Sequence, residues 1–153
     1  MYSWCQHIEF HHAGYKMPQI LLHIKIIIES EYDLGAGYLK HCTIIVNESG
    51  EHGVPPHSNK HKDNQFFDIS LGDRMTMVLR KVADKSVYKE IQLANNSLLA
   101  VGKKDNQALK HEIVKDPKVL CRYSVVFRHI IDTSAKEAER FMPVDLVLIT
   151  SLT

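Results

Sequence analysis

The sequence has few cysteines, and they are far apart. Cys5, Cys42 and Cys121 are its three cysteines, and no two of them form a C-x-x-C pair. An odd number of isolated cysteines with no secretory leader predicts buried thiols in a reducing, cytoplasmic environment. We therefore expect no disulfide partner and no cysteine-based zinc site.

A large charge imbalance and a long apolar run are also missing. With 19 basic and 18 acidic residues, the formal net charge is +1, so no overall basic field indicates nucleic-acid binding. The longest apolar run, residues 20–28, is interrupted by His23 and Lys25 and is too short to span a bilayer. At 153 residues the chain is long enough for one domain with one core, and we expect no membrane contact.

Short strands separated by turn signals are predicted for most of the chain after residue 40. They span residues 42–47, 66–71, 76–81, 87–93, 98–101, 108–114 and 121–131. Many short strands of this kind favour a β-sandwich or a barrel. The polar residues 103–107 are interpreted as a hairpin-like connection, and Pro55-Pro56 as a turn.

One predicted strand carries an unusual pair of charges, in the sequence Arg122-Tyr-Ser-Val-Val-Phe-Arg128. Side chains on a strand alternate between its two faces, so Arg122, Ser124, Val126 and Arg128 share one face. Arginine keeps its charge in proteins, so two guanidiniums directed into an interior need anionic or strongly polar partners. A small dicarboxylate is one candidate, and local acidic side chains are the alternative.

Several further motifs stand in a fixed order around this strand. They are Tyr2-Ser-Trp4, Met17-Pro-Gln-Ile-Leu21, Thr43-Ile-Ile-Val-Asn47, Phe67-Asp-Ile-Ser-Leu-Gly-Asp73, Asn95-Asn-Ser-Leu-Leu-Ala-Val-Gly102 and Gln107-Ala-Leu-Lys-His111. The ordered set resembles the AlkB-like family of Fe(II)- and 2-oxoglutarate-dependent dioxygenases, and above all the AlkB-like domains of plant RNA virus replicases. This resemblance covers residues 2–130. It implies a mostly β fold, a double-stranded β-helix (jelly roll), preceded by a helical portion that includes residues 20–28.

The resemblance also divides the chain. Residues 1–131 correspond to the AlkB-like domain, and residues 132–153 to a linker or an added C-terminal segment. In the viral relatives this domain belongs to a larger polyprotein, which would place the chain inside the cell.

The same resemblance implies a set of metal ligands. Such enzymes bind Fe(II) through two histidines and one carboxylate, with positions left open for the cosubstrate and O2. His111 matches the distal histidine. The segment Val54-Pro-Pro-His-Ser-Asn59 matches the proximal motif, which makes His57 the first imidazole and puts Asn59 in the carboxylate position. An amide is a poorer ligand for Fe(II), so this departure puts activity in doubt.

A competing register uses His61-Lys-Asp63, which restores a true H-x-D motif. Its spacing to the neighbouring motifs fits less well than that of His57, because Leu71 follows His61 by only ten residues. A mixed set of His57 with Asp63 also stays open. A solvated loop is the ordinary alternative for His61 and Asp63.

The cosubstrate pocket implied by the family contains the two arginines and an N-x-Y element. Arg122 and Arg128 would pair with the carboxylates of 2-oxoglutarate, and Arg128 would also help to form the catalytic pocket. Asn47 matches the family asparagine, whereas Ser49 stands where the family has tyrosine. Loss of that hydroxyl contact should weaken binding by about 1 kcal/mol.

Two functions follow as expectations. The first is oxidative demethylation of N-methylated nucleobases by Fe(II), 2-oxoglutarate and O2. Its substrate would be methylated single-stranded RNA or DNA, because the target base must reach the metal. The second is a catalytically degenerate domain of the same fold that binds RNA or a protein, which the replacements Asn59 and Ser49 motivate.

Overall fold

The computed structural model describes residues 6–11, 17–51, 53–58 and 65–129. Its elements, in chain order, are β1 (Gln6–His11), α1 (Gln19–Glu31), β2 (His41–Asn47), β3 (Val54–His57), β4 (Phe66–Gly72), β5 (Met75–Lys81), β6 (Val87–Leu93), β7 (Ser97–Val101), α2 (Lys103–Ala108), β8 (Leu109–Ile113) and β9 (Arg122–Arg128). Residues 132–153, the proposed linker or added segment, lie outside the described residues.

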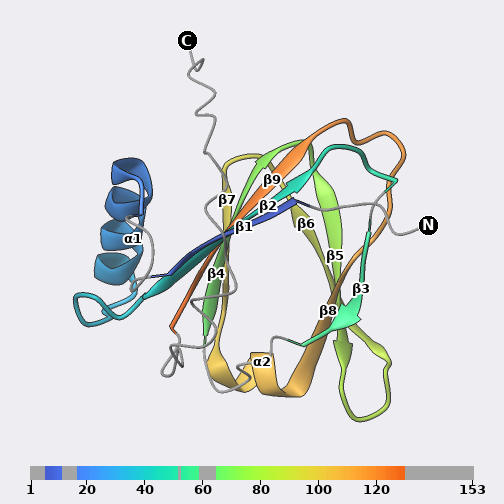
Figure 1. Ribbon diagram of the computed structural model, residues 1–153. Helices are drawn as coiled ribbons and strands as arrows, with labels where there is room; N and C mark the ends of the chain where they lie inside the picture. The colour runs from blue at the N-terminus through green and yellow to red at the C-terminus, as the bar shows by residue number, and fades with distance from the viewer. Residues whose placement is uncertain (1–5, 12–16, 52, 59–64, 130–153) are drawn as a thin grey trace.

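The strands form two antiparallel sheets that face each other (Figure 1). The larger sheet has the order β1-β2-β9-β4-β7, and the smaller has the order β3-β8-β5-β6. Neighbours such as β9 and β4 are far apart in sequence, because the chain crosses repeatedly between the two sheets. This arrangement confirms the predicted jelly roll.

Side chains along β9 alternate between the two faces of the larger sheet. Arg122, Ser124 and Val126 point into the space between the sheets. Val125 and Phe127 point to the other face and are 6% and 0% exposed, because helix α1 covers them there. The sheet is therefore buried on both faces, and its inner face is the polar one.

Helix α1 packs against the outer face of the larger sheet (Figure 1). Leu21 and Ile28 contact the hydrophobic cluster that includes Phe127, and each residue of that cluster is less than a tenth exposed. Lys25 and Glu29 lie on this buried face as an ion pair with an N–O distance of 3.0 Å. The helix prediction for residues 20–28 is thus confirmed.

The Glu29 carboxylate also fixes the chain between α1 and β2. It accepts hydrogen bonds from the backbone N–H of Leu39 at 2.7 Å and of Gly37 at 3.2 Å. Burial would raise the pKa of Glu29, but these bonds and the contact with Lys25 outweigh it and lower the pKa. Strand β2 consequently enters the sheet at a defined position.

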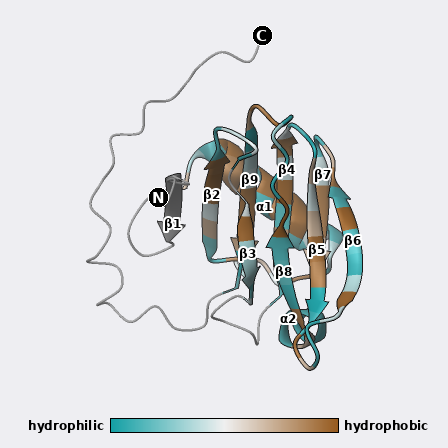
Figure 2. Ribbon diagram, turned by 90° about the vertical axis from the view of Figure 1, so that its right-hand side faces the viewer, coloured by the Kyte–Doolittle hydropathy of each residue, from teal (hydrophilic) through white to brown (hydrophobic). Residues whose placement is uncertain are grey.

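The smaller sheet has a buried inner face and a solvated outer face. Met75, Met77 and Leu79 of β5 form its core with residues of β6 and β8. Figure 2 shows this sheet toward the viewer, with hydrophilic residues prominent on β6 and β8. On that outer side Arg80 donates a hydrogen bond to Glu112 at 2.8 Å.

Two local predictions were wrong, and one strand was not predicted. Residues 103–107 belong to the short helix α2 rather than to a hairpin connection. The Pro55-Pro56 segment belongs to strand β3 at the edge of the smaller sheet, where missing backbone N–H groups are tolerated. Strand β1, which was not predicted, extends the larger sheet beyond β2.

Across the described residues, no helix has the length and apolar character needed to cross a membrane.

Candidate functional site

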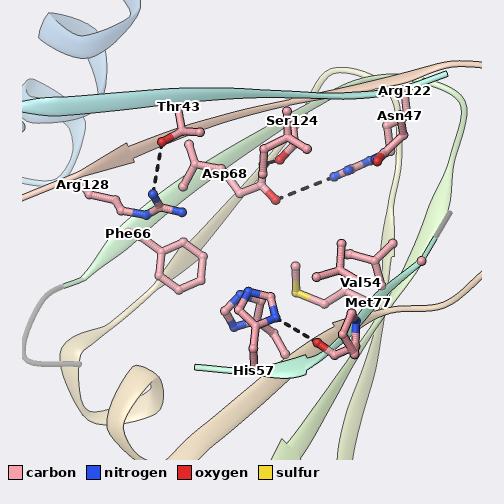
Figure 3. Close-up of a pocket in the computed structure, with 16 residues that line it drawn as sticks. Thr43, Asn47, Val54, His57, Phe66, Asp68, Met77, Arg122, Ser124 and Arg128 are labelled. Carbon is pink, nitrogen blue, oxygen red and sulfur yellow. Dashed lines mark hydrogen bonds and ion pairs between the residues drawn. The ribbon is translucent and has the colours of Figure 1, made fainter. Parts of the chain in front are cut away.

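A cavity of about 320 Å³ lies between the two sheets (Figure 3). The larger sheet contributes its polar lining from β2, β4 and β9, and the smaller sheet contributes two histidines and apolar side chains from β3, β5 and β8. This volume is at the lower end of the range typical of small-molecule sites. The cavity therefore places charged groups opposite imidazoles in a space suited to one small ligand.

The two histidines are His57 on β3 and His111 on β8. They are directly opposite each other in the register of these antiparallel strands, and their ring centroids are 4.0 Å apart. Nδ1 of His57 lies 3.0 Å from the carbonyl oxygen of Pro55. Because a carbonyl can only accept, Nδ1 donates this bond, and Nε2 is the ring nitrogen that the bond leaves uncommitted. Such a nitrogen is suited to bind a metal ion.

His111 is held in its neutral form. Burial lowers its pKa to about 3, and the nearby His57 and Arg128 contribute to the decrease. A histidine must be deprotonated to bind a metal, so at neutral pH His111 needs to release no proton. The two histidines that the sequence predicted as metal ligands thus lie close enough together to bind one divalent cation.

The third predicted metal ligand is not placed by the structure. Asn59 and the alternative pair His61 and Asp63 lie outside the described residues. Within the described part of the chain, no three His, Cys, Asp or Glu side chains gather into a metal-binding group. The donor set visible at the cavity therefore fits two of the three protein ligands of an Fe(II) site.

Arg122 is the most deeply buried charged residue of the cavity. It is 2% exposed, and its Nη2 donates a hydrogen bond to Oγ of Ser70 at 2.8 Å. Its Nε, also buried, has no hydrogen-bond partner among the described residues. A buried donor of this kind on a permanently charged group calls for an acceptor, which a ligand carboxylate would supply.

Arg128 is half-buried at the other end of the same strand (Figure 3). Its Nη1 donates a hydrogen bond to Oγ1 of Thr43 at 3.1 Å. It is close enough to His111 to lower that residue's pKa. The prediction that Arg122 and Arg128 share one interior face is confirmed, and Arg128 is the arginine next to the histidine pair.

Asn47 also lies where the sequence placed it. It is 2% exposed, lines the cavity, and is opposite Arg122 in the register of β2 and β9. Ser49 is not among the residues that line the cavity. The cavity thus contains three of the predicted cosubstrate-binding residues, and the position that is tyrosine in the family contributes nothing to its lining.

Asp68 is a cavity residue that the sequence interpretation missed. It is 4% exposed, accepts a hydrogen bond from Ser124, and lies 3.7 Å from Nη2 of Arg122 (Figure 3). Burial raises the pKa of the Asp68 carboxyl, while Ser124, Arg122 and Arg128 oppose this increase. The signal was present, because Phe66, Asp68 and Ser70 alternate onto one face of a predicted strand.

A tight connection fixes the start of β9 and with it Arg122. The carboxylate of Asp73 accepts hydrogen bonds from the backbone N–H of Leu120 at 2.7 Å and of Cys121 at 3.2 Å. Gly72 has φ +88°, and a Cβ there would come within 2.6 Å of the Cys121 carbonyl oxygen. The Ser-Leu-Gly motif of the sequence therefore has a structural reason for its glycine.

The two facing antiparallel sheets define the class of fold, a jelly roll. Among solved structures, OsALKBH1 superposes with a TM-score of 0.57 at 17% identity, over 75% of this chain and 65% of that one. YcfD, a ribosomal oxygenase from Escherichia coli, superposes with a TM-score of 0.51 at 15% identity, over 74% of this chain and 29% of that one.

These likenesses concern the fold. The chain spans less than two thirds of the length of either structure. No family model matches the sequence, and no curated protein matches it either. The suggested relation to viral replicase domains stays a prediction.

Proposed function

We propose that the protein is an Fe(II)- and 2-oxoglutarate-dependent oxygenase that removes N-methyl groups from nucleobases in single-stranded RNA. One observation carries the proposal: two adjacent imidazoles on the smaller sheet face two inward guanidiniums on the larger sheet across a single cavity. Imidazoles suit a divalent metal ion, and guanidiniums suit the carboxylates of a 2-oxo acid.

Each residue has a defined task in this proposal. His57 and His111 would hold the metal, with Asn59 as the third candidate. Arg128, next to His111, would orient the end of the cosubstrate nearer the metal. Arg122 would bind its distal carboxylate, using the Nε that has no protein acceptor among the described residues.

The chemistry that Fe(II) supplies in such enzymes couples decarboxylation of 2-oxoglutarate by O2 to hydroxylation of a methyl group, which leaves as formaldehyde. The protein's part is to exclude water and orient the reactants. Val54, Met77 and Ile113 provide the apolar wall beside the histidines. Because the histidines line a cavity between two sheets, a target base has to leave its stack to reach them, which favours a single-stranded substrate.

The test is succinate formation by the purified chain. Protein loaded anaerobically with Fe(II) and 2-oxoglutarate is exposed to O2 with N-methylated single-stranded RNA, with the same RNA unmethylated, or with methylated single-stranded DNA. We expect succinate and formaldehyde to rise together only with a methylated strand. Equal succinate with all three nucleic acids would contradict the demethylase proposal.

The same cavity supports a second candidate, a binding domain of this fold without turnover. Asp68 beside Arg122 and the amide at position 59 both favour it. In that case the chain would bind the 2-oxo acid or the RNA, but the assay above would give no succinate with any nucleic acid.

A further inference from the structure

The inner face of the larger sheet carries more positive than negative charge. Of the described residues that line the cavity, Arg122 and Arg128 are the cations and Asp68 is the acid. In the register of β4 and β9, Asp68 is opposite Val126, two positions from Arg128 and four from Arg122. The acid thus lies between the two arginines along the strand, as Figure 3 also shows.

Asp68 already forms an ion pair with one of the nitrogens through which Arg122 could bind a ligand. Its Oδ2 is 3.7 Å from Nη2 of Arg122, the same nitrogen that donates to Ser70 at 2.8 Å. The side chains of Arg122 and Asp68 are 2% and 6% exposed, so water screens their attraction only weakly. A ligand carboxylate that approaches Arg122 must therefore also approach the negative charge of Asp68.

Arg128 is in a different situation. Its Nη1 donates to the neutral hydroxyl of Thr43, and it lies beside the histidines. A ligand carboxylate at this end would approach the Arg128 guanidinium beside the two imidazoles. The two ends of the cavity consequently differ: the Arg128 end adjoins the histidine pair, whereas at the Arg122 end the carboxylate of Asp68 offsets the positive charge.

We propose that Asp68 is a specificity-determining residue that removes most of the advantage of a second carboxylate. The cavity would then accept 2-oxo acids with one carboxylate, such as 2-oxopentanoate, nearly as well as 2-oxoglutarate. This inference rests on the part of the proposed function in which the cavity binds a 2-oxo acid, and it identifies the class of acid.

The experiment measures equilibrium binding of 2-oxoglutarate and of 2-oxopentanoate to the full chain, anaerobically with Fe(II) and again without metal. The wild type should bind 2-oxoglutarate less than about ten-fold more tightly than 2-oxopentanoate. The reason is that the negative charge of Asp68 offsets most of the attraction between Arg122 and the second carboxylate. The variant Asp68→Asn keeps the shape and removes the charge, and its preference should rise by at least about five-fold. A smaller rise overturns the inference.

Glu112→Gln is the matched control, because Glu112 also pairs with an arginine, Arg80, but does not line the cavity. It should leave the preference unchanged, and an equal rise in this variant would show that overall charge, not Asp68, is responsible. If Asp68→Asn does not fold, the wild-type value decides alone, with a preference above about ten-fold contradicting the inference. Absence of binding by both acids also contradicts it.

The outcome separates this inference from the proposed function. If the preference rises in Asp68→Asn but binding is the same with and without Fe(II), Asp68 has the proposed role and the metal part of the function fails. If Fe(II) strengthens binding but the preference does not change in Asp68→Asn, the metal part of the proposed function is supported and the proposed role of Asp68 fails.

Discussion

The interaction between Arg122 and Asp68 can be measured directly by a double-mutant cycle. At 3.7 Å, two unit charges attract by about 4 kcal/mol at the effective dielectric constant that fits protein sites. Removing one partner of a buried pair costs about 3–5 kcal/mol, because the other charge stays buried without it. We therefore expect Arg122→Met to lower the free energy of unfolding by about this amount at pH 7.5.

The double variant Arg122→Met with Asp68→Asn should be more stable than the sum of the single effects predicts. A coupling energy of about 1–3 kcal/mol is expected for two buried groups in one network. Urea unfolding of the wild type and the three variants gives the four free energies, and unchanged m-values confirm that the comparison is valid. Additivity within about 0.5 kcal/mol would refute the reasoning.

The pH dependence gives an independent check on the same pair. Burial raises the pKa of Asp68 in the folded protein, so its contribution to stability is greatest below the unfolded pKa and is lost as the pH rises through the folded value. Without Arg122 this effect should grow. The destabilisation of Arg122→Met should therefore be smaller at pH 5 than at pH 8.

Three further predictions concern other parts of the chain. Glu29→Gln should lower the free energy of unfolding by about 2 kcal/mol at neutral pH, because it removes the charged acceptor of the Leu39 N–H. Since the folded pKa of Glu29 is lowered, this difference, measured by urea unfolding, should shrink as the pH falls below 4.5; a constant difference would contradict it. Asn59→Asp should strengthen Fe(II) binding in equilibrium dialysis if residue 59 is a metal ligand, and unchanged affinity would count against that register. Gly72→Ala should destabilise the protein by about 1–3 kcal/mol in thermal unfolding, because φ is +88° and the Cβ would meet the Cys121 carbonyl; an unchanged melting temperature would refute the strain argument.

The sequence could predict which side chains of a single strand point into the site, because side chains alternate between the two faces of a strand. The inward positions of Arg122 and Arg128 follow from strand geometry alone, whatever the tertiary context. The same rule applied to residues 66–70 identifies Asp68 as an inward acid. The motif of residues 67–73 marks the strand as a whole, and only the alternation of its side chains distinguishes Asp68 as an inward residue.

Contacts between distant strands could not be derived in this way. His57 and His111 are 54 positions apart, and their 4.0 Å approach depends on the register between β3 and β8. The Pro55-Pro56 pair resembled a turn, and only its place at a sheet edge explains a strand there.

Lys25 shows a different limit of sequence interpretation. In the sequence it is a charge that interrupts the apolar run of residues 20–28. In the structure it is 6% exposed with Glu29 as its partner, whereas Ile26 and Ile27 are 58% and 59% exposed. The helical spacing of Leu21, Lys25 and Ile28 puts these three on one face, so the period of the helix outweighs the polarity of a single residue.

The proposed function requires that the paired imidazoles bind a metal ion together with a 2-oxo acid. Its most direct test is anaerobic Fe(II) binding, with and without 2-oxoglutarate, by the wild type, by His111→Ala and by His23→Ala, which removes an exposed histidine of α1 as a control. We predict one bound Fe(II) per chain, tighter with 2-oxoglutarate, retained in His23→Ala and lost in His111→Ala. Iron bound equally by His111→Ala would contradict the assignment of the site.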